Sequence, residues 1–253
     1  MKKIVEKNFE LITFDIDGTL TRSKLPLDEK MAALLCQLMS KYKVAIISGA
    51  SYEQFKWQIL GPLVCQREKI QNLYLLPVDG TVFCSYHDDW QCQYDAPLSK
   101  EEKERIKTAF ENIFEESGFE SPGKIYGELV EDRGAQLNFS ALGQEAPIEL
   151  KEKWDPDNKK RERMIEVLKR TLSGFSMRIG GTTSIEITKA GIDKAYGLNK
   201  LIERTGIPKE RMLYIGDKLF KGGNDEPALT LGIESRAVGN PEEAKKVILE
   251  LLG

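Results

Sequence analysis

An apolar run ends in two carboxylates at Leu11-Ile12-Thr13-Phe14-Asp15-Ile16-Asp17-Gly18-Thr19-Leu20-Thr21. The apolar part predicts a buried strand of a parallel sheet. Asp15 and Asp17 alternate with Ile16, so both carboxylates point the same way where the strand ends. Ligands of open α/β sheets bind beyond the carboxyl ends of the strands. Two acids at that place suit a phosphoryl group, because one can attack phosphorus and the other can protonate the leaving oxygen.

The pattern around this stretch alternates between strands and helices. Strands are predicted at about 10–16, 44–47 and 73–76, and helices at 28–42 and 51–60. The alternation resumes with a helix at 192–205, a strand at 212–215, a short strand from 235 and a helix at 241–252. This order predicts an α/β fold with a Rossmann-like parallel-sheet core.

A different pattern interrupts this core. After Asp79-Gly80 the sequence indicates a hairpin that reaches Tyr94, then charged helices at 99–116 and 156–172. Strands are predicted at 125–131, 135–140, 175–179 and 184–188. Helices followed by antiparallel strands are typical of an α+β module. We therefore expect a catalytic core of residues 1–87 and 189–253, with an inserted α+β cap at 88–188 that sets substrate specificity.

Composition narrows the classes of function. The chain has 253 residues, 41% of them hydrophobic, and a net charge of −3, which gives no electrostatic drive toward nucleic acid. The start is polar and charged, and no apolar run approaches the ~20 residues of a membrane span, so we expect a cytoplasmic protein without membrane contact. The four cysteines are then expected as free thiols, although Cys84 and Cys92 could face each other across the hairpin. His87, the single histidine, is expected in an exposed turn.

Four polar pieces follow core elements and predict one site. They are the Asp15-to-Thr19 segment, Ser48-Gly49 after the second strand, Lys194 at the start of a helix, and Asp217 followed by Asn224-Asp225. The hydroxyl of Ser48 and the N–H of Gly49 can bind phosphate oxygens. Each piece is weak alone, but their order along the chain is the signal.

The chemistry of phosphate monoesters explains why these residue types are needed together. Mg²⁺ removes the repulsion between a phosphate dianion and a carboxylate nucleophile, and it prefers oxygen ligands. We expect Asp15, the main-chain carbonyl of Asp17 and Asp217 to bind it. Lys194 adds a fixed positive charge, and Asn224 and Asp225 orient Asp217 and bound waters. Asp15 is the predicted nucleophile, and Asp17 the general acid and then base.

These pieces, in this order, resemble the haloacid dehalogenase superfamily of phosphotransferases with an inserted α+β cap. Within it, the chain is most similar to the eukaryotic-type phosphomannomutases, colinearly over nearly the whole length. The similarity is carried by five stretches: 15–21, 131–140, 179–186, 191–194 and Gly216-Asp217-Lys218 leading to Gly222-Gly223-Asn224-Asp225. The double glycine before Asn-Asp is the most specific of them.

The resemblance also implies substrate contacts in the cap. That family holds the second phosphate of its substrate with cap arginines, and Arg133 occupies the place of the first. Gln144 and Lys151 stand where two further arginines are expected, and Lys24 replaces another after Thr21. Ser184 matches a serine that contacts the sugar, and Glu186 replaces an aspartate. The resemblance further implies a phosphorylated sugar as substrate and a homodimer formed through the caps.

Three functions remain open on the sequence alone. The first is an Mg²⁺-dependent sugar-phosphate phosphatase, and the second a true phosphomannomutase that returns the phosphoryl group to another hydroxyl of the hexose. The third is a non-catalytic sugar-phosphate-binding protein, which the presence of Asp15, Asp17, Lys194 and Asp217 disfavours. The phosphatase is slightly favoured, because the uncharged Gln144 weakens capture of a second phosphate.

Overall fold

The computed structural model describes residues 8–22 and 24–253 and divides the chain into two compact units. The first comprises Met1–Tyr94 and Asp193–Gly253, and the second Asp95–Ile192. Residues 1–7 of the expected core lie outside the described residues. Both boundaries lie later than the expected 87/88 and 188/189. Residues 90–94 remain with the first unit because they form the last strand of its sheet.

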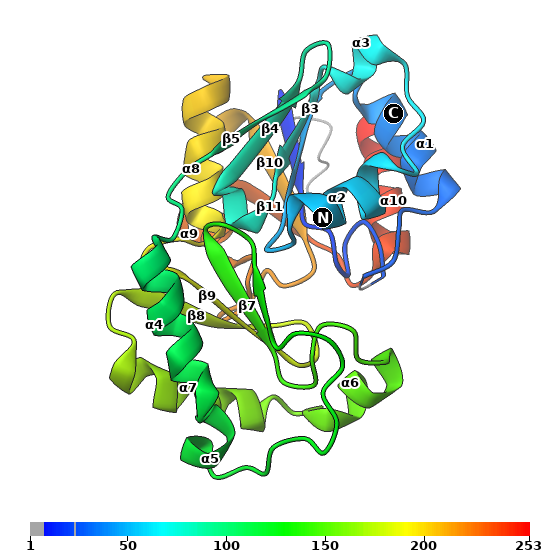
Figure 1. Ribbon diagram of the computed structural model, residues 1–253. Helices are drawn as coiled ribbons and strands as arrows, with labels where there is room; N and C mark the ends of the chain where they lie inside the picture. Colours follow the sequence, from blue (N-terminus) through cyan, green and yellow to red (C-terminus); the bar gives the residue numbers. More distant parts are fainter. Residues whose placement is uncertain (1–7, 23) are drawn as a thin grey trace. The chain divides into compact units, whose positions relative to one another are not determined.

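The first unit is built on a seven-stranded sheet in the order β11-β10-β1-β2-β3-β4-β5 (Figure 1). Strands β1 to β3, β10 and β11 are mutually parallel, and the β4–β5 hairpin adds two antiparallel strands at one edge. This confirms the predicted α/β class. The strands are β1 (Leu11–Phe14), β2 (Lys43–Ile47), β3 (Leu73–Leu76), β4 (Val82–Tyr86), β5 (Trp90–Tyr94), β10 (Met212–Gly216) and β11 (Glu234–Ala237).

Helices cover both faces of this sheet (Figure 1), which is why β1, β2 and β10 are almost uniformly apolar. One face carries α8 and α9, and the other carries α1 packed on α10. Asp193 accepts a hydrogen bond from the Tyr196 N–H at 3.1 Å and so fixes the first turn of α8 at Lys194. The helical elements are α1 (Glu29–Leu38), α2 (Tyr52–Phe55), the π-helix η2 (Lys56–Leu60), α3 (Arg67–Ile70), the 3₁₀ turns η3 (Val78–Gly80) and η4 (Lys209–Arg211), α8 (Lys194–Thr205), α9 (Glu226–Thr230) and α10 (Pro241–Leu252).

Two glycines bring α8 against η3. A Cβ on Gly80, whose φ is +84°, would lie 2.2 Å from the Cα of Gly197. A Cβ on Gly197 would lie 2.5 Å from the carbonyl oxygen of Asp79 and 2.7 Å from Ile47. The backbones therefore pack directly on each other, which fixes α8 against the sheet. Asp79-Gly80, which the sequence placed just before the hairpin, is buried in this contact.

The expectation of free thiols is wrong, because both cysteine pairs form disulfides. Cys84 and Cys92 are register partners of β4 and β5, with Cα atoms 4.1 Å apart. Cys36 on α1 bonds to Cys65, which follows η2, across a Cα separation of 5.7 Å. The hairpin pattern had left a Cys84–Cys92 contact open, whereas the Cys36–Cys65 pair depends on which elements lie side by side, which its spacing in the sequence does not reveal. His87 lies exposed in the β4–β5 turn, as expected.

The second unit is a four-stranded antiparallel sheet in the order β6-β7-β9-β8 with its own apolar core. The predicted strand at 125–131 begins only at Val130, because Gly127 adopts φ +71° and Tyr126 bonds to the Leu142 loop instead. Helix 99–116 breaks at Asn112, and α6 was not predicted. The elements are α4 (Lys100–Glu111), α5 (Ile113–Ser117), β6 (Val130–Asp132), β7 (Gln136–Ser140), α6 (Ile148–Trp154), α7 (Lys159–Thr171), β8 (Phe175–Gly180) and β9 (Ser184–Lys189).

No helix within residues 8–22 and 24–253 has the length and apolar character that a membrane span requires.

Candidate active site

Three predicted site residues follow adjacent parallel strands. Asp15 comes after β1, Ser48 after β2 and Asp217 after β10, and β1 lies between the other two strands. The Asp15 N–H donates to the Ile215 carbonyl at 3.1 Å, so the β1–β10 pairing extends to the carboxylate itself. The carboxyl edge of the sheet therefore gathers residues that are some 200 positions apart in the sequence, as the parallel-strand rule requires.

The ammonium group of Lys194 lies between two carboxylates. Its Nζ is 2.5 Å from Oδ1 of Asp15, 2.6 Å from Oδ1 of Asp225 and 3.3 Å from the hydroxyl of Tyr214. All four side chains are nearly or completely buried. Lys194 thus connects the predicted nucleophile to the Asn224-Asp225 loop. Tyr214 was missed by the sequence reasoning, although a hydroxyl in the otherwise apolar Met212–Ile215 run was its signal.

Burial and charge set the protonation states of this cluster. Burial raises the pKa of Asp15 from 3.8 to about 7, and the nearby Asp225 and Asp217 charges act in the same direction, against the attraction of Lys194. Burial alone would lower the pKa of Lys194, but the attraction of Asp15 and Asp225 holds it well above its ordinary value. Burial also opposes ionisation of Asp225, but the Lys194 charge and hydrogen bonds outweigh it and lower the pKa of Asp225. Of the two carboxylates that contact Lys194, Asp225 therefore ionises more readily, and Asp15 keeps its proton to higher pH.

The carboxylates of Asp15, Asp217 and Asp225 form a candidate metal site. One oxygen of each lies within 4.8 Å of the others. Oδ1 of Asp217 is buried and has no hydrogen-bond partner among the described residues, and burial raises the pKa of Asp217. A divalent cation would satisfy that oxygen, and an all-oxygen donor set fits a hard cation. Asp225 is less available, because it also accepts from the Tyr214 hydroxyl at 2.5 Å and from the Lys218 N–H at 3.0 Å.

Asp17 is held apart from this cluster. Its Oδ1 accepts the backbone N–H of Lys24 at 2.8 Å and Nε2 of Gln58 at 3.3 Å. Lys24 therefore contributes its main chain here, and its side chain is exposed. Gln58 was not singled out from the sequence, although an amide between the apolar Trp57 and Ile59 was a usable signal.

The residues expected to bind phosphate lie in the loops that follow β1 and β2. Gly18 has φ +87°, and a Cβ there would lie 2.4 Å from Oδ2 of Asp217, so glycine is required. The hydroxyl of Thr19 is buried without a hydrogen-bond partner in the described part of the chain. Ser48 is buried with its Oγ bound to the Ala50 N–H at 3.2 Å, and Gly49 is half-buried beside it. Asn224 is exposed on its loop, unlike Asp225.

The expected cap residues form a separate polar group on the sheet of the second unit. Arg133 donates to Oε2 of Glu131 at 2.7 and 2.9 Å and to Gln136 at 3.0 Å, and lies 3.9 Å from Oε1 of Glu186. The Arg133 side chain is only 10% exposed. Two carboxylates therefore balance its charge, and this pairing was not predicted.

Gln144 and Lys151 belong to the same polar group. The Gln144 amide donates to the carbonyls of Asn138 at 2.9 Å and Leu129 at 3.2 Å, and Lys151 donates to the Gln144 carbonyl at 2.8 Å. Ser184 is buried on β9, two positions before Glu186 and so on the same face. The structure thus places Arg133 near Glu186 and Lys151 on Gln144, but it ties the polar groups of Arg133, Gln144 and Lys151 to neighbouring side chains and to the backbone.

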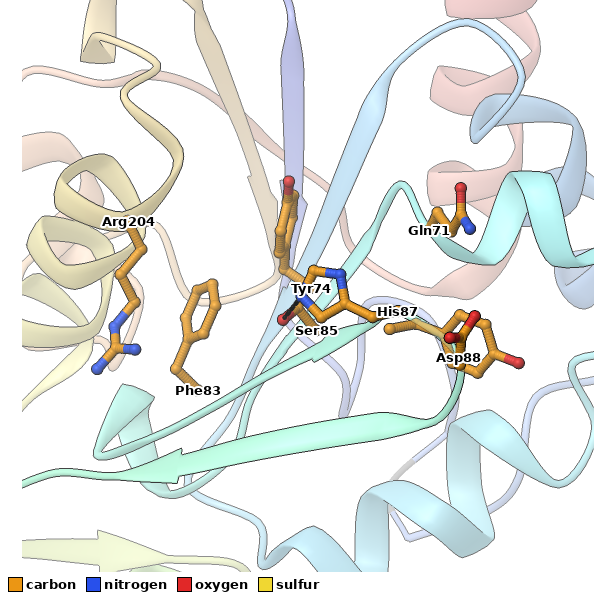
Figure 2. Close-up of a pocket in the computed structure, with 8 residues that line it drawn as sticks. Gln71, Tyr74, Phe83, Ser85, His87, Asp88 and Arg204 are labelled. Atoms are coloured by element: carbon orange, nitrogen blue, oxygen red, sulfur yellow. Dashed lines mark hydrogen bonds between the residues drawn. The ribbon is translucent and has the colours of Figure 1, made fainter.

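A cavity of about 430 Å³ lies elsewhere in the first unit, along β3 and β4 (Figure 2). Tyr74 and Phe83 line it, with Arg204 beside Phe83, and His87 bonds to Ser85 near the turn. Because β4 runs antiparallel to β3, this turn lies at the edge of the sheet opposite Asp15. None of the predicted site residues lines this cavity.

Comparisons with known proteins bear on the family and the fold of this chain. The profile of the haloacid dehalogenase-like hydrolases matches residues 12–249. Phosphomannomutase of Saccharomyces cerevisiae is 28% identical over 97% of this chain and 95% of its own length. Phosphomannomutase 1 of Homo sapiens is 27% identical over 85% of this chain and 81% of its own length.

Solved structures share the fold at lower identity. A haloacid dehalogenase-like hydrolase from Bacteroides thetaiotaomicron superposes with a TM-score of 0.63 at 17% identity, over 96% of this chain and 99% of that one. The IMP-nucleotidase of Plasmodium falciparum gives a TM-score of 0.72 at 18% identity, over 97% of this chain but 61% of that one. These likenesses bear on the fold alone.

Proposed function

This chain belongs to the haloacid dehalogenase-like hydrolases, and on that premise we propose that it hydrolyses a sugar phosphate through an aspartyl-phosphate on Asp15. The observation that carries the proposal is the different placement of two acids in one turn. Asp15 contacts a buried ammonium at the end of β1, whereas Asp17 is fixed separately by Lys24 and Gln58. Two carboxylates in different surroundings can take two different roles.

In the first half-reaction, an oxygen of the Asp15 carboxylate attacks phosphorus. The bond from phosphorus to the sugar oxygen breaks, and Asp17 gives its proton to that oxygen, so the sugar leaves as a neutral alcohol. Lys194 stays protonated beside Asp15 and opposes the negative charge that gathers on the phosphoryl group. The buried hydroxyl of Thr19 is a donor available to a phosphoryl oxygen.

In the second half-reaction, the ionised Asp17 takes a proton from a water molecule. The resulting hydroxide attacks phosphorus and breaks the bond to Asp15. Inorganic phosphate leaves, and both acids return to their starting states. In both half-reactions Asp225 holds Lys194 in place by accepting its 2.6 Å hydrogen bond, and the Tyr214 hydroxyl in turn donates to Asp225.

We propose Mg²⁺ as the cation that this reaction needs. Its ligands would be Asp15, the Asp17 carbonyl and Asp217. Oδ1 of Asp217 is suited to this because it is buried and has no hydrogen-bond partner among the described residues. When bound, it neutralises phosphate charge and favours the ionised form of Asp15. Asp225 would not bind the cation; its role is to hold Lys194 in place.

The partners of the basic side chains in the second unit favour hydrolysis over isomerisation. A mutase has to keep hold of a sugar bisphosphate while the sugar turns over, which requires uncompensated positive charge for the second phosphate. Here Arg133 already pairs with Glu131 and lies near Glu186, and the Lys151 ammonium binds a backbone carbonyl. A second phosphate would have to displace these partners. The sugar itself is proposed from the relatives that bear the name phosphomannomutase.

Product analysis tests this proposal. The purified chain is incubated with Mg²⁺ and mannose 1-phosphate, with and without a trace of hexose 1,6-bisphosphate, and both inorganic phosphate and hexose 6-phosphate are measured. We expect phosphate release that does not depend on the bisphosphate. Isomerised sugar phosphate as the main product, formed only with the bisphosphate, would instead establish the mutase, which the 27–28% identity to phosphomannomutases favours.

A further inference from the structure

The π-helix η2 places an amide inside the first unit. Helix α2 continues into η2, where the Gly61 N–H donates to the Lys56 carbonyl five residues earlier at 2.8 Å. The wider turn leaves Gln58 with no exposed surface at all. A buried amide is costly unless its donors and acceptor are satisfied, so its partners define what it does.

Both ends of the Gln58 side-chain amide have partners. Its Oε1 accepts from Nε2 of Gln54 at 2.7 Å, and its Nε2 donates to the Leu25 carbonyl at 3.0 Å and to Asp17 at 3.3 Å. The orientation of the amide is determined, because a backbone carbonyl can only accept and must face Nε2. Its own carbonyl accepts from the Leu27 N–H at 2.9 Å. Gln58 therefore joins η2 to the segment that follows the Asp17 turn.

Both hydrogen bonds that the structure gives to the Asp17 carboxylate fall on the same oxygen. Oδ1 accepts from Gln58 and from the Lys24 N–H, on two different segments. Two donors on one oxygen fix the plane of the carboxylate and leave Oδ2 for proton transfer. Proton transfer by a general acid requires hydrogen-bond reach of the leaving oxygen, so the rotation of this side chain matters.

We propose that Gln58 is a positioning residue that holds Asp17 ready to protonate the leaving oxygen. The inference rests on the proposed function, because it needs Asp17 to act as general acid. A residue that acts only through the general acid has a specific signature. Its loss slows the reaction of substrates whose leaving group needs a proton. Its loss does not slow cleavage of the same bond when the leaving group departs as a stable anion.

The test compares a sugar phosphate with p-nitrophenyl phosphate, whose phenolate leaves without protonation. Gln58→Met removes the hydrogen bonds at similar volume, and Gln54→Ala removes only the donor that orients the amide. Asp17→Asn is the reference, and Gln37→Met, an exposed glutamine on α1, is the matched control. The readouts are kcat and KM for mannose 1-phosphate and the rapid burst of p-nitrophenolate, which reports the first half-reaction alone.

We expect Gln58→Met to lower kcat for the sugar phosphate about 10- to 100-fold, the scale of a misplaced catalytic group, with KM nearly unchanged. Gln54→Ala should act in the same direction with a smaller effect, and the p-nitrophenolate burst rate should stay within about twofold of wild type in both. An equal loss for both substrates in Gln58→Met and in Gln54→Ala would overturn the inference, because a purely structural glutamine acts on both.

The outcomes separate the inference from the proposed function. If Asp17→Asn shows the leaving-group signature and the glutamine variants do not, Gln58 does not position Asp17 although the proposed chemistry holds. If Asp17→Asn lowers both rates equally, or if the wild type releases no phosphate, the general-acid role of Asp17 fails and the inference falls with it. Should Gln58→Met not fold, Gln54→Ala decides by the same comparison.

Discussion

Replacing Lys194 by methionine removes the positive charge that lies between Asp15 and Asp225 at 2.5 and 2.6 Å, in a place where the lysine side chain is 1% exposed. Removing one partner of a buried ion pair typically costs about 3–5 kcal/mol, because the remaining charge is left buried and uncompensated. For a chain of this size that corresponds to a fall of roughly 6–20 °C in Tm. Lys200→Met is the control, since it removes the partly exposed pair with Glu203 on the same helix, and loss of that pair should cost at most about 0.5 kcal/mol.

The pH dependence of this loss has a definite sign. The pKa of Asp15 rises from 3.8 to about 7 on folding, so between those values the folded protein binds a proton that the unfolded chain releases, and this group makes stability fall as pH rises. Lys194 attracts both carboxylates and so lowers the pKa of Asp15 and of Asp225. Without it both pKa values rise, so the pH range over which stability falls with pH extends to higher pH.

Urea unfolding of metal-free wild type and both variants, at about pH 5 and about pH 8, measures the effect. The deficit of Lys194→Met should be larger at the higher pH. A deficit below about 1 kcal/mol, or an equal deficit at both pH values, would refute the buried charge cluster as described.

Three further predictions concern the same unit. Asp15→Asn should abolish phosphate release while far-UV circular dichroism stays unchanged, because an amide cannot form the acyl phosphate; wild-type turnover in this variant would rule out the nucleophile assignment. Excess EDTA should stop the reaction and added Mg²⁺ restore it, and full activity in chelator would contradict the metal requirement. Gly197→Ala should lower the unfolding free energy by about 1–3 kcal/mol, since its Cβ would lie 2.5 Å from the Asp79 carbonyl oxygen. An unchanged urea midpoint would show that α8 can move away.

The parallel core and its carboxyl-edge residues were predictable because they depend on local patterns. An apolar run followed by a polar pair specifies both a strand and the place where its side chains leave the sheet. Asp15, Ser48 and Asp217 needed only that rule, and the alternation with helices supplied the parallel order. Their assembly follows from chain direction rather than from detailed packing.

The features that escaped prediction depend on contacts that the folding of the chain creates. The Cys36–Cys65 disulfide follows from the packing of α1 near η2. The ion pair between Arg133 and Glu131 joins residues only two positions apart, but it depends on the turn between β6 and β7. The contact of Gln58 with Asp17 arises from a helical turn of unusual width. A sequence pattern records which side chains are polar, but the identity of their partners is set by tertiary packing.

The π-turn at Lys56–Leu60 has a consequence for the ancestry of this segment. A helix that gains one residue can keep both of its ends in place by widening a single turn, and the π-turn at Lys56–Leu60 has the form that such an insertion would take. Deleting Ile59 should then restore an ordinary helical turn without moving Phe55 or Gly61. A relative that lacked this residue would match the chain on both sides of the turn, and its counterpart of Gln58 would be found by its place in space rather than by counting.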